Sequence, residues 1–234
     1  MGSRLNGGLV VAHELRQPVS TMRQLAFCIQ MSNSAMERQE LAQKIIDLSN
    51  STLRQINLLA ETMDKCGNLT MEPVAVRQIC NEVSSDIKTA LTGQEYHLKI
   101  SYKNRARLVM ANPILLKNIL ENFCINAVKF SESETESMLT VTEHNFSSIV
   151  RLSVRDYGPA IPVNVWRELA SGELKIPPEV MMRPSDSFLS GSGIGLYTAS
   201  RFAKLMRGRI GAIRHRDGAS FFIELPTLKQ QELF

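Results

Sequence analysis

The sequence predicts an α+β fold, in which a helical hairpin that forms a dimeric four-helix bundle precedes a two-layer α/β sandwich. In the first part, apolar residues recur at alternating spacings of four and three, which is typical of helices that pack along a seam. In the second part, short alternating runs that are typical of strands stand between helical segments. The stretch KCGNLTMEP, with its glycine and proline, separates the two patterns. We therefore expect a hairpin over residues 1–66, a linker over 67–73 and the sandwich over 74–228.

The hairpin should consist of a first helix from about Leu5 to Ile29, a turn over the polar stretch MSNSAMERQE, and a second long helix. Two helices alone cannot bury two seams, so we expect a homodimer that closes a four-helix bundle. The seam residues are Val11, Leu15, Pro18, Met22, Leu25 and Ile29 in the first helix and, with a shift of one residue, Leu41, Ile45, Leu48, Thr52, Ile56, Leu59 and Met63 in the second.

His13 does not belong to the seam of the first helix. It lies about 200° round the helix from the nearest seam residues, so its imidazole is expected to face water, and Gln17 shares this face one turn later. Pro18 has no N–H to bond the carbonyl of Glu14, so a bend is expected beside the histidine. Taken alone, an exposed histidine next to a glutamate is more often an ordinary surface residue than a site.

The sandwich should place helices on one face of a mostly antiparallel sheet. Asn112 and Pro113 form a helix start, as N-cap and first helical residue. Between Pro162 and Gly191 a long insert without a regular pattern is expected to be a lid. Helices are expected at about Val74–Leu91, 112–131 and 195–208, and strands at 96–102, 138–144, 148–156, 209–215 and 219–226.

The composition excludes several classes of protein. A chain of 234 residues with 44% hydrophobic residues can bury a sizeable core, and a net charge of +4 spread among acids gives no basic face for nucleic acid. No apolar run is long enough to span a membrane, so we expect a soluble, cytoplasmic piece of a longer protein. Whether an upstream sensor or a membrane anchor precedes it stays open. Reduced thiols, rather than a zinc site or a disulfide framework, are expected for Cys28, Cys66, Cys80 and Cys124, which form no C-x-x-C pair.

Two polar motifs in the sandwich are not explained by packing. Asn122 and Asn126 lie one helical turn apart, and Lys129 follows three residues later, so the three side chains can face one side of the helix. Asp156 follows an apolar strand and is followed in turn by Gly158. Each of these patterns alone is weak, because asparagine pairs are often solvated and an aspartate at a strand end is often a turn former.

A third motif, GSGIGL, places glycines directly before a helix. Glycines at a helix start let backbone N–H groups approach an anion such as a phosphate. A single glycine loop is more often only a turn. The glycines are Gly191, Gly193 and Gly195.

In their order, the motifs N-x-x-x-N-A-x-K-F, D-x-G and G-x-G-x-G-L resemble the N, G1 and G2 boxes of the GHKL ATPases, which include gyrase, Hsp90, MutL and the histidine kinases. The stretch HELRQP upstream resembles the H-box of sensor histidine kinases, which the other three lack. The chain is therefore similar, from about Val10 to Pro226, to a sensor histidine kinase catalytic core. Such a core joins a HisKA-type phosphoacceptor hairpin to a GHKL-type, or Bergerat-type, ATP-binding domain.

The resemblance implies an enzyme that uses ATP and Mg²⁺. His13 would be the phosphoacceptor and Glu14 the adjacent acid or base. Asn126 would hold Mg²⁺ through its carboxamide oxygen, close to Asn122 and the phosphates, since Mg²⁺ prefers oxygen ligands. The other implied nucleotide-binding residues are Lys129, Gly191, Gly193, Gly195 and Leu196 at the phosphates, Phe130 in the pocket, Asp156 at the adenine amine, Gly158 beside it in the sequence motif, and Ile161 against the base.

The sequence departs from the family pattern in three places. Gln17 stands where the H-box usually has Thr or Asn, and we interpret its carboxamide as able to position water for dephosphorylation of a receiver domain. Ala160 stands where the G1 box has its second glycine; if that backbone needs a positive φ, nucleotide affinity is weakened. The lid lacks the usual aromatic and arginine segment, and Lys175, Arg183 and Phe188 are candidate substitutes.

The function expected from the resemblance is autophosphorylation of His13 from Mg-ATP and transfer of the phosphoryl group to an aspartate of a response regulator, with dephosphorylation as a further hypothesis. The alternatives are a degenerate kinase that acts as a dimeric nucleotide-binding scaffold, and a stand-alone ATPase. The other histidines, His97, His144 and His215, are expected on the surface, and Trp166 is expected to be a packing residue.

Overall fold

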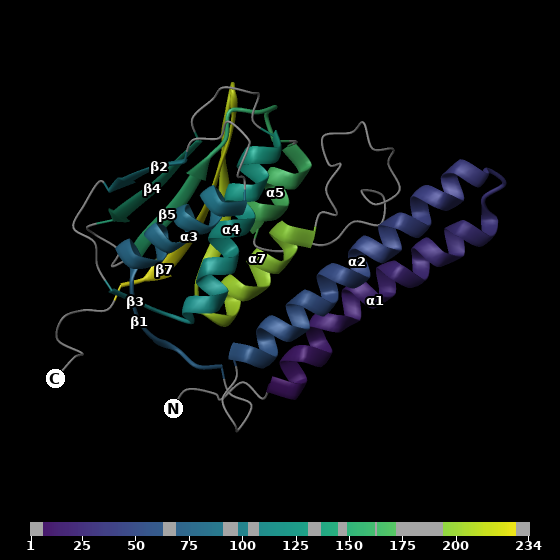
Figure 1. Cartoon of the computed structure of the whole chain (residues 1–234), viewed down its shortest axis with the longest axis horizontal. Helices are drawn as coiled ribbons and strands as arrows, with labels where there is room; N and C mark the ends of the chain where they lie inside the picture. Colours follow the sequence, from purple (N-terminus) through teal and green to yellow (C-terminus); the bar gives the residue numbers. More distant parts are fainter. Residues whose placement is uncertain are drawn as a thin grey trace. The chain divides into compact units, whose positions relative to one another are not determined.

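The structure, a computed structural model, describes residues 7–62, 69–90, 98–102, 108–130, 137–144, 149–161, 163–171 and 194–227 (Figure 1). The chain forms two compact units, residues 1–70 with 175–198 and residues 71–174 with 199–234. The boundary between the units falls within helix α7 (Ile194–Leu205).

The first unit contains a helical hairpin of α1 (Gly7–Met31) and α2 (Ala35–Thr62). The two helices pack against each other along leucines that are at most 5% exposed, so the predicted seam forms the contact. α1 continues through Pro18, which is buried. The buried leucines are Leu25, Leu41, Leu48 and Leu59.

The turn of the hairpin is shorter than expected. The prediction of a turn up to Glu40 was wrong, because only Ser32–Ser34 separate the helices. The polar residues of this stretch are cap and surface residues of α2. The Ser34 hydroxyl accepts the backbone N–H of Glu37 at 3.3 Å, and the Ser34 carbonyl accepts that of Arg38 at 3.0 Å, so Ser34 is the N-cap.

The second unit is built on a five-stranded sheet in the order β2-β4-β5-β7-β6. β2 pairs parallel with β4 and every other pair is antiparallel, as the prediction of a mostly antiparallel sheet requires. The strands are β2 (Leu98–Tyr102), β4 (Ser137–His144), β5 (Ile149–Arg155), β6 (Arg209–His215) and β7 (Gly218–Pro226).

Helices α3 (Val76–Ala90) and α4 (Pro113–Phe130) lie on one face of this sheet (Figure 1). The predicted start of α4 is confirmed: the Asn112 side-chain oxygen accepts the N–H of Leu115 at 3.0 Å. The core lies between α3, α4 and the sheet and includes Val83, Leu116, Ile119, Phe123, Leu152, Val154 and Ile223.

Three elements, the strands β1 (Glu72–Ala75) and β3 (Leu108–Ala111) and the helix α5 (Val163–Ser171), are absent from the prediction. Val74 and Ala75 do not begin a helix but end strand β1, because they pair with β3 in a separate two-stranded sheet. The expected lid begins with helix α5, which Trp166 joins to β6 by donating its indole N–H to the Ala212 carbonyl at 3.0 Å. Residues 172–193 of the lid lie outside the described part of the chain.

The thiols of Cys28, Cys80 and Cys124 are free, as predicted, and Cys66 lies outside the described residues. Burial raises the pKa of Cys80 and of Cys124 to about 12, so neither forms a reactive thiolate near neutral pH. Among the described residues, none of the helices combines the length and the apolar character that a membrane span needs.

Candidate functional site

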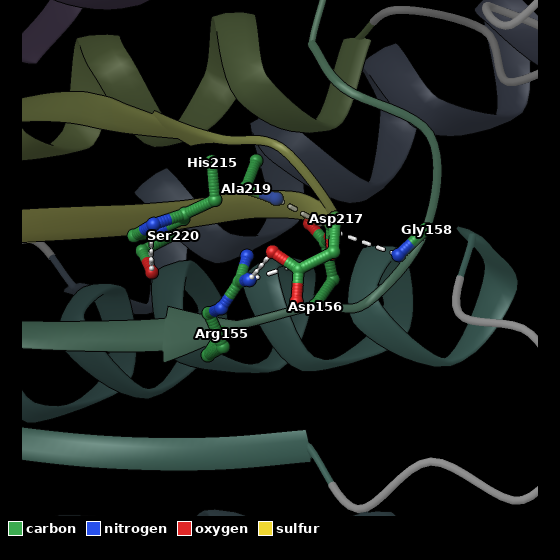
Figure 2. Close-up of polar contacts among 7 residues, drawn as sticks. All are labelled: Arg155, Asp156, Gly158, His215, Asp217, Ala219 and Ser220. Carbon is green, nitrogen blue, oxygen red and sulfur yellow. Dashed lines mark hydrogen bonds and ion pairs between the residues drawn. The ribbon is translucent and has the colours of Figure 1, made fainter.

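The best-defined polar site of the second unit lies at the end of β5. Asp156 follows the strand directly and is only 4% exposed. Its Oδ1 atom accepts the backbone N–H of Ala219 at 2.9 Å and that of Gly158 at 3.3 Å (Figure 2). Its own backbone N–H donates to the Ala219 carbonyl at 2.9 Å. Two backbone segments therefore fix the carboxylate where β5 meets the beginning of β7.

Burial raises the pKa of the Asp156 carboxyl. The N–H groups of Ala219 and Gly158 and the charge of Arg155 act in the opposite direction without cancelling the effect of burial. The ionised carboxylate is thus under-compensated, and one more N–H donor from a ligand would stabilise it.

Around Asp156, Gly158 and Ile161 are buried, whereas Ala160 is exposed. Among the described residues other than glycine, only Arg207 has a positive φ, so the backbone at Ala160 is not strained. The condition under which alanine was expected to weaken the site, a positive φ at Ala160, is therefore not met. Ile161 supplies an apolar side chain close in sequence to the carboxylate.

Asn122 and Asn126 lie one turn apart on α4 and are both half-buried. The Asn122 amide donates to the Asn118 side-chain oxygen at 3.0 Å, which leaves the Asn122 oxygen as an acceptor. The Asn126 side chain makes no hydrogen bond to another described residue, so its carboxamide oxygen can serve as a ligand. No group of three or more His, Cys, Asp and Glu side chains able to hold a metal occurs among the described residues. Asn126 thus fits Mg²⁺ that takes its other ligands from phosphates and water.

Other predicted residues are placed only in part. Lys129 and Phe130 end α4, and Gly195 and Leu196 lie half-buried in the first turn of α7. His13, Glu14 and Gln17 lie on α1. The remaining predictions lie outside the described residues, namely the side chains of His13, Glu14, Gln17, Lys129, Phe130 and His144, and all of Lys175, Arg183, Phe188, Gly191, Gly193 and His97.

The turn between β6 and β7 contributes residues that sequence reasoning missed. Arg155 donates from Nη2 to Oδ1 of Asp217 at 2.6 Å and to its carbonyl oxygen at 3.3 Å. Gly218 follows with a φ of 127°. The dipeptide Asp217-Gly218 between two strand-like runs is a hairpin signal, and it could have directed attention to this turn.

His215, expected on the surface, is half-buried at the end of β6. Its Nε2 atom lies 2.9 Å from the Ser220 hydroxyl oxygen (Figure 2). Burial lowers the pKa of the imidazole, and the charge of Arg155 lowers it further.

Comparison with known proteins supports this fold. Residues 111–229 match the model of the family "Histidine kinase-, DNA gyrase B-, and HSP90-like ATPase". The matched segment contains Asn122, Asn126 and Asp156 as well as the β6–β7 turn.

The adaptive-response sensory kinase SasA of Prochlorococcus marinus (strain MIT 9313) is 25% identical over 229 residues, which are 93% of this chain and 57% of that protein. The chain thus spans little more than half the length of this relative. Among solved structures, full-length ShkA in complex with AMPPNP is 22% identical with a TM-score of 0.58, and covers 96% of this chain and 47% of that one. The catalytic domain of histidine kinase ThkA is 19% identical with a TM-score of 0.55, and the match covers 68% of this chain and 97% of that one.

The two structural likenesses establish the fold of the chain, and the family match covers half of its length. Of the predicted site residues, Asn122 and Asn126 lie on α4, Asp156 lies at the end of β5, and Gly195 and Leu196 lie at the start of α7. The chain belongs to the histidine kinase-, DNA gyrase B- and HSP90-like ATPase family, has the GHKL ATP-binding fold, and is similar over most of its length to the cores of sensor histidine kinases.

Proposed function

We propose that the chain is a protein histidine kinase core that phosphorylates His13 from Mg-ATP. In this proposal residues 1–66 are the dimerisation and phosphotransfer hairpin, 67–73 the linker and 74–228 the ATP-binding domain. The observation that carries it is the buried Asp156 carboxylate, whose Oδ1 is held by two backbone N–H groups. A carboxylate fixed in this way is suited to accept the exocyclic amine of adenine.

The nucleotide contacts follow from the residues of the boxes. Asp156 would accept the adenine amine, and Ile161 would pack against the base. Asn126 would hold Mg²⁺ beside Asn122. The structure of full-length ShkA was solved in complex with AMPPNP, an analogue of ATP, and this supports ATP as the nucleotide. The phosphates would be held by Lys129, Gly191, Gly193 and Gly195, with Leu196 following.

The chemistry is a phosphoryl transfer, which depends mainly on positioning and on charge neutralisation. A ring nitrogen of His13 attacks the γ-phosphorus of ATP while the bond from that phosphorus to the β,γ-bridging oxygen breaks, so ADP leaves. Glu14 accepts the proton that the imidazole loses. A histidine with an ordinary pKa near 6.5 is largely neutral at pH 7 and is therefore a competent nucleophile.

A homodimer is supported by the surface of the hairpin. Val19, Phe27, Ile46 and Leu53 are between 50% and 57% exposed, which is unusual for large apolar side chains on two packed helices. A second copy of the hairpin would bury them and complete a four-helix bundle. His13, which the sequence pattern places off the helical seam, would then be available to a receiver domain of a response regulator, whose aspartate would take the phosphoryl group.

Incubation of the chain with ATP labelled at the γ-phosphate tests the proposal. We expect label on the wild-type protein that is stable in base and lost in acid, as a phosphohistidine requires. His13→Ala should carry no label, and Asp156→Asn should carry little, whereas His144→Ala, at a histidine outside the predicted boxes, is the matched control and should be labelled. Nucleotide binding without labelling of the wild type would indicate the scaffold alternative, and phosphate release that does not depend on His13 would indicate a stand-alone ATPase.

A further inference from the structure

We propose that Gly218 and Ala219, at the start of β7, are positioning residues that aim the Asp156 carboxylate and thereby set the preference for adenine. This inference rests on the proposed nucleotide-binding function and goes beyond it, because it assigns the choice of base to a turn outside the predicted boxes. Asp156 and Ala219 meet at the junction of β5 and the β6–β7 turn (Figure 2).

Gly218 combines an unusual backbone conformation with a close approach to Asp156. Its φ of 127° is a backbone conformation that residues with a side chain rarely adopt. A Cβ atom at this position would lie 2.4 Å from the carbonyl oxygen of Asp156 and 2.7 Å from its Oδ1. One of these two atoms belongs to the backbone, so rotating the Asp156 side chain cannot remove both clashes. Any side chain at 218 therefore displaces the turn, the end of β5 or the carboxylate.

The two oxygens of the Asp156 carboxylate differ in their hydrogen bonds. Oδ1 of Asp156 already accepts N–H groups from Ala219 and Gly158, whereas Oδ2 accepts none from the described residues. With Oδ1 fixed, Oδ2 is presented in one direction only. An amine, as on adenine, can donate to it. A carbonyl oxygen, as at the same position of hypoxanthine, is an acceptor and would be repelled.

Arg155 and Asp217 form an ion pair beside Asp156. The Arg155 side chain is 15% exposed, and its guanidinium carbon lies 4.6 Å from the centre of the Tyr157 ring. Its two hydrogen bonds to Asp217 hold the turn against the residue that precedes Asp156. Arg155 and Asp217 therefore stabilise the turn in the place from which Ala219 reaches the carboxylate.

The test is equilibrium binding of ATP and of ITP, which carries hypoxanthine, by calorimetry with Mg²⁺ present. We expect the wild type to prefer ATP by about tenfold or more. Gly218→Ala should weaken ATP binding by about tenfold and bring the ratio of the two dissociation constants close to one. Gly211→Ala is the matched control in the same hairpin, because its Cβ would lie 2.4 Å from the Phe222 ring and away from Asp156. It should leave the ratio unchanged.

A change in the ratio separates positioning from general damage, since a destabilised fold weakens both nucleotides alike. If circular dichroism shows that Gly218→Ala does not fold, Asp217→Asn is the second test, because the Asp217 side chain is 69% exposed and its replacement is expected to cost little stability. It should lower the ATP preference by a few-fold. An unchanged ratio in a folded Gly218→Ala protein, or in Asp217→Asn when Gly218→Ala does not fold, overturns the inference. A wild type that binds neither nucleotide overturns the proposed function itself.

Discussion

Asp156 and Ala219, from strands distant in the sequence, hold each other through two hydrogen bonds of 2.9 Å. The N–H of Asp156 donates to the carbonyl of Ala219, and the N–H of Ala219 donates to Oδ1 of Asp156. The carboxylate is thus oriented by backbone atoms rather than by side chains. It is also buried, so the free protein keeps a charge at a cost that a ligand can offset.

Asp156→Asn should separate stability from binding. Because burial raises the pKa of Asp156 in the folded state, the carboxyl favours folding when protonated, below its unfolded value near 3.8, and this contribution is lost as pH rises through the folded pKa. The asparagine cannot ionise and still accepts the Ala219 N–H. We expect its free energy of unfolding at pH 7 to exceed that of the wild type by on the order of 1 kcal/mol, while ATP binding falls at least about tenfold.

Urea unfolding at pH 7 and at pH 3 measures the expected increase in the free energy of unfolding, which should be smaller at pH 3. A variant that is less stable than the wild type at pH 7 would contradict the account of a costly buried charge.

Ala160→Gly should not improve nucleotide binding. Ala160 has no positive φ and an exposed side chain, so a glycine removes no strain and only adds freedom to the unfolded chain. We expect a loss of stability of about 0.5–1 kcal/mol and a dissociation constant for ATP within about twofold of the wild type. Calorimetric titration measures this constant. Tighter binding by tenfold would mean that alanine does impair the site.

Gln17→Ala tests the hypothesis of dephosphorylation. If the carboxamide positions water at a phosphorylated receiver, its removal should slow dephosphorylation by about tenfold or more and leave labelling of His13 intact. Gln24→Ala, an exposed position on the same helix, is the control. Phosphate release is followed from a receiver domain that accepts the phosphoryl group from the wild-type chain. Equal rates for Gln17→Ala and the wild type would end the hypothesis.

Glu224 should be important for the sheet rather than for catalysis. It is 5% exposed on β7, where it accepts Arg151 Nε at 2.9 Å and pairs with Arg209 as well. Burial acts to raise its pKa, but the hydrogen bonds from the two arginines outweigh this, so the pKa lies below its ordinary value. The contribution of Glu224 to stability is therefore present above pH 4.5, the unfolded value, and is lost as pH falls through the folded pKa.

Glu224→Gln should lower the free energy of unfolding at pH 7 by about 1–2 kcal/mol, since it leaves two arginines without their counter-charge. Asp86→Asn breaks the more exposed pair with Lys117 and should cost less than about 0.5 kcal/mol. Urea unfolding compares the two variants. A loss at Glu224 no larger than that at Asp86 would show that the buried pairing does not stabilise the sheet.

The sequence predicted elements that local signals define. The cap at Asn112 and Pro113 and the apolar spacing that follows identify α4 without reference to the rest of the chain. By contrast, Val74 and Ala75 fit the start of a helix equally well, and they form a strand only because Leu108 and Val109 pair with them. The helix beginning at Val163 was missed because it is one short element of nine residues beside an insert rich in proline.

The candidate site also contains residues that local sequence signals identify and residues that they do not. Asp156 and the asparagines of α4 were predicted from the order and spacing of the sequence motifs. The part played by Gly218 could not, because it depends on how close the turn comes to the Asp156 backbone. The supposed strain at Ala160 was inferred from residue type, and the backbone conformation removes it.

A crystal structure of the chain with Mg²⁺ and AMPPNP would show whether Asp156 receives the adenine base. We expect the adenine amine within about 3 Å of Oδ2 of Asp156, with the metal at the Asn126 oxygen. An analogue bound with its base away from Asp156, or no bound analogue at millimolar concentration, would contradict this expectation.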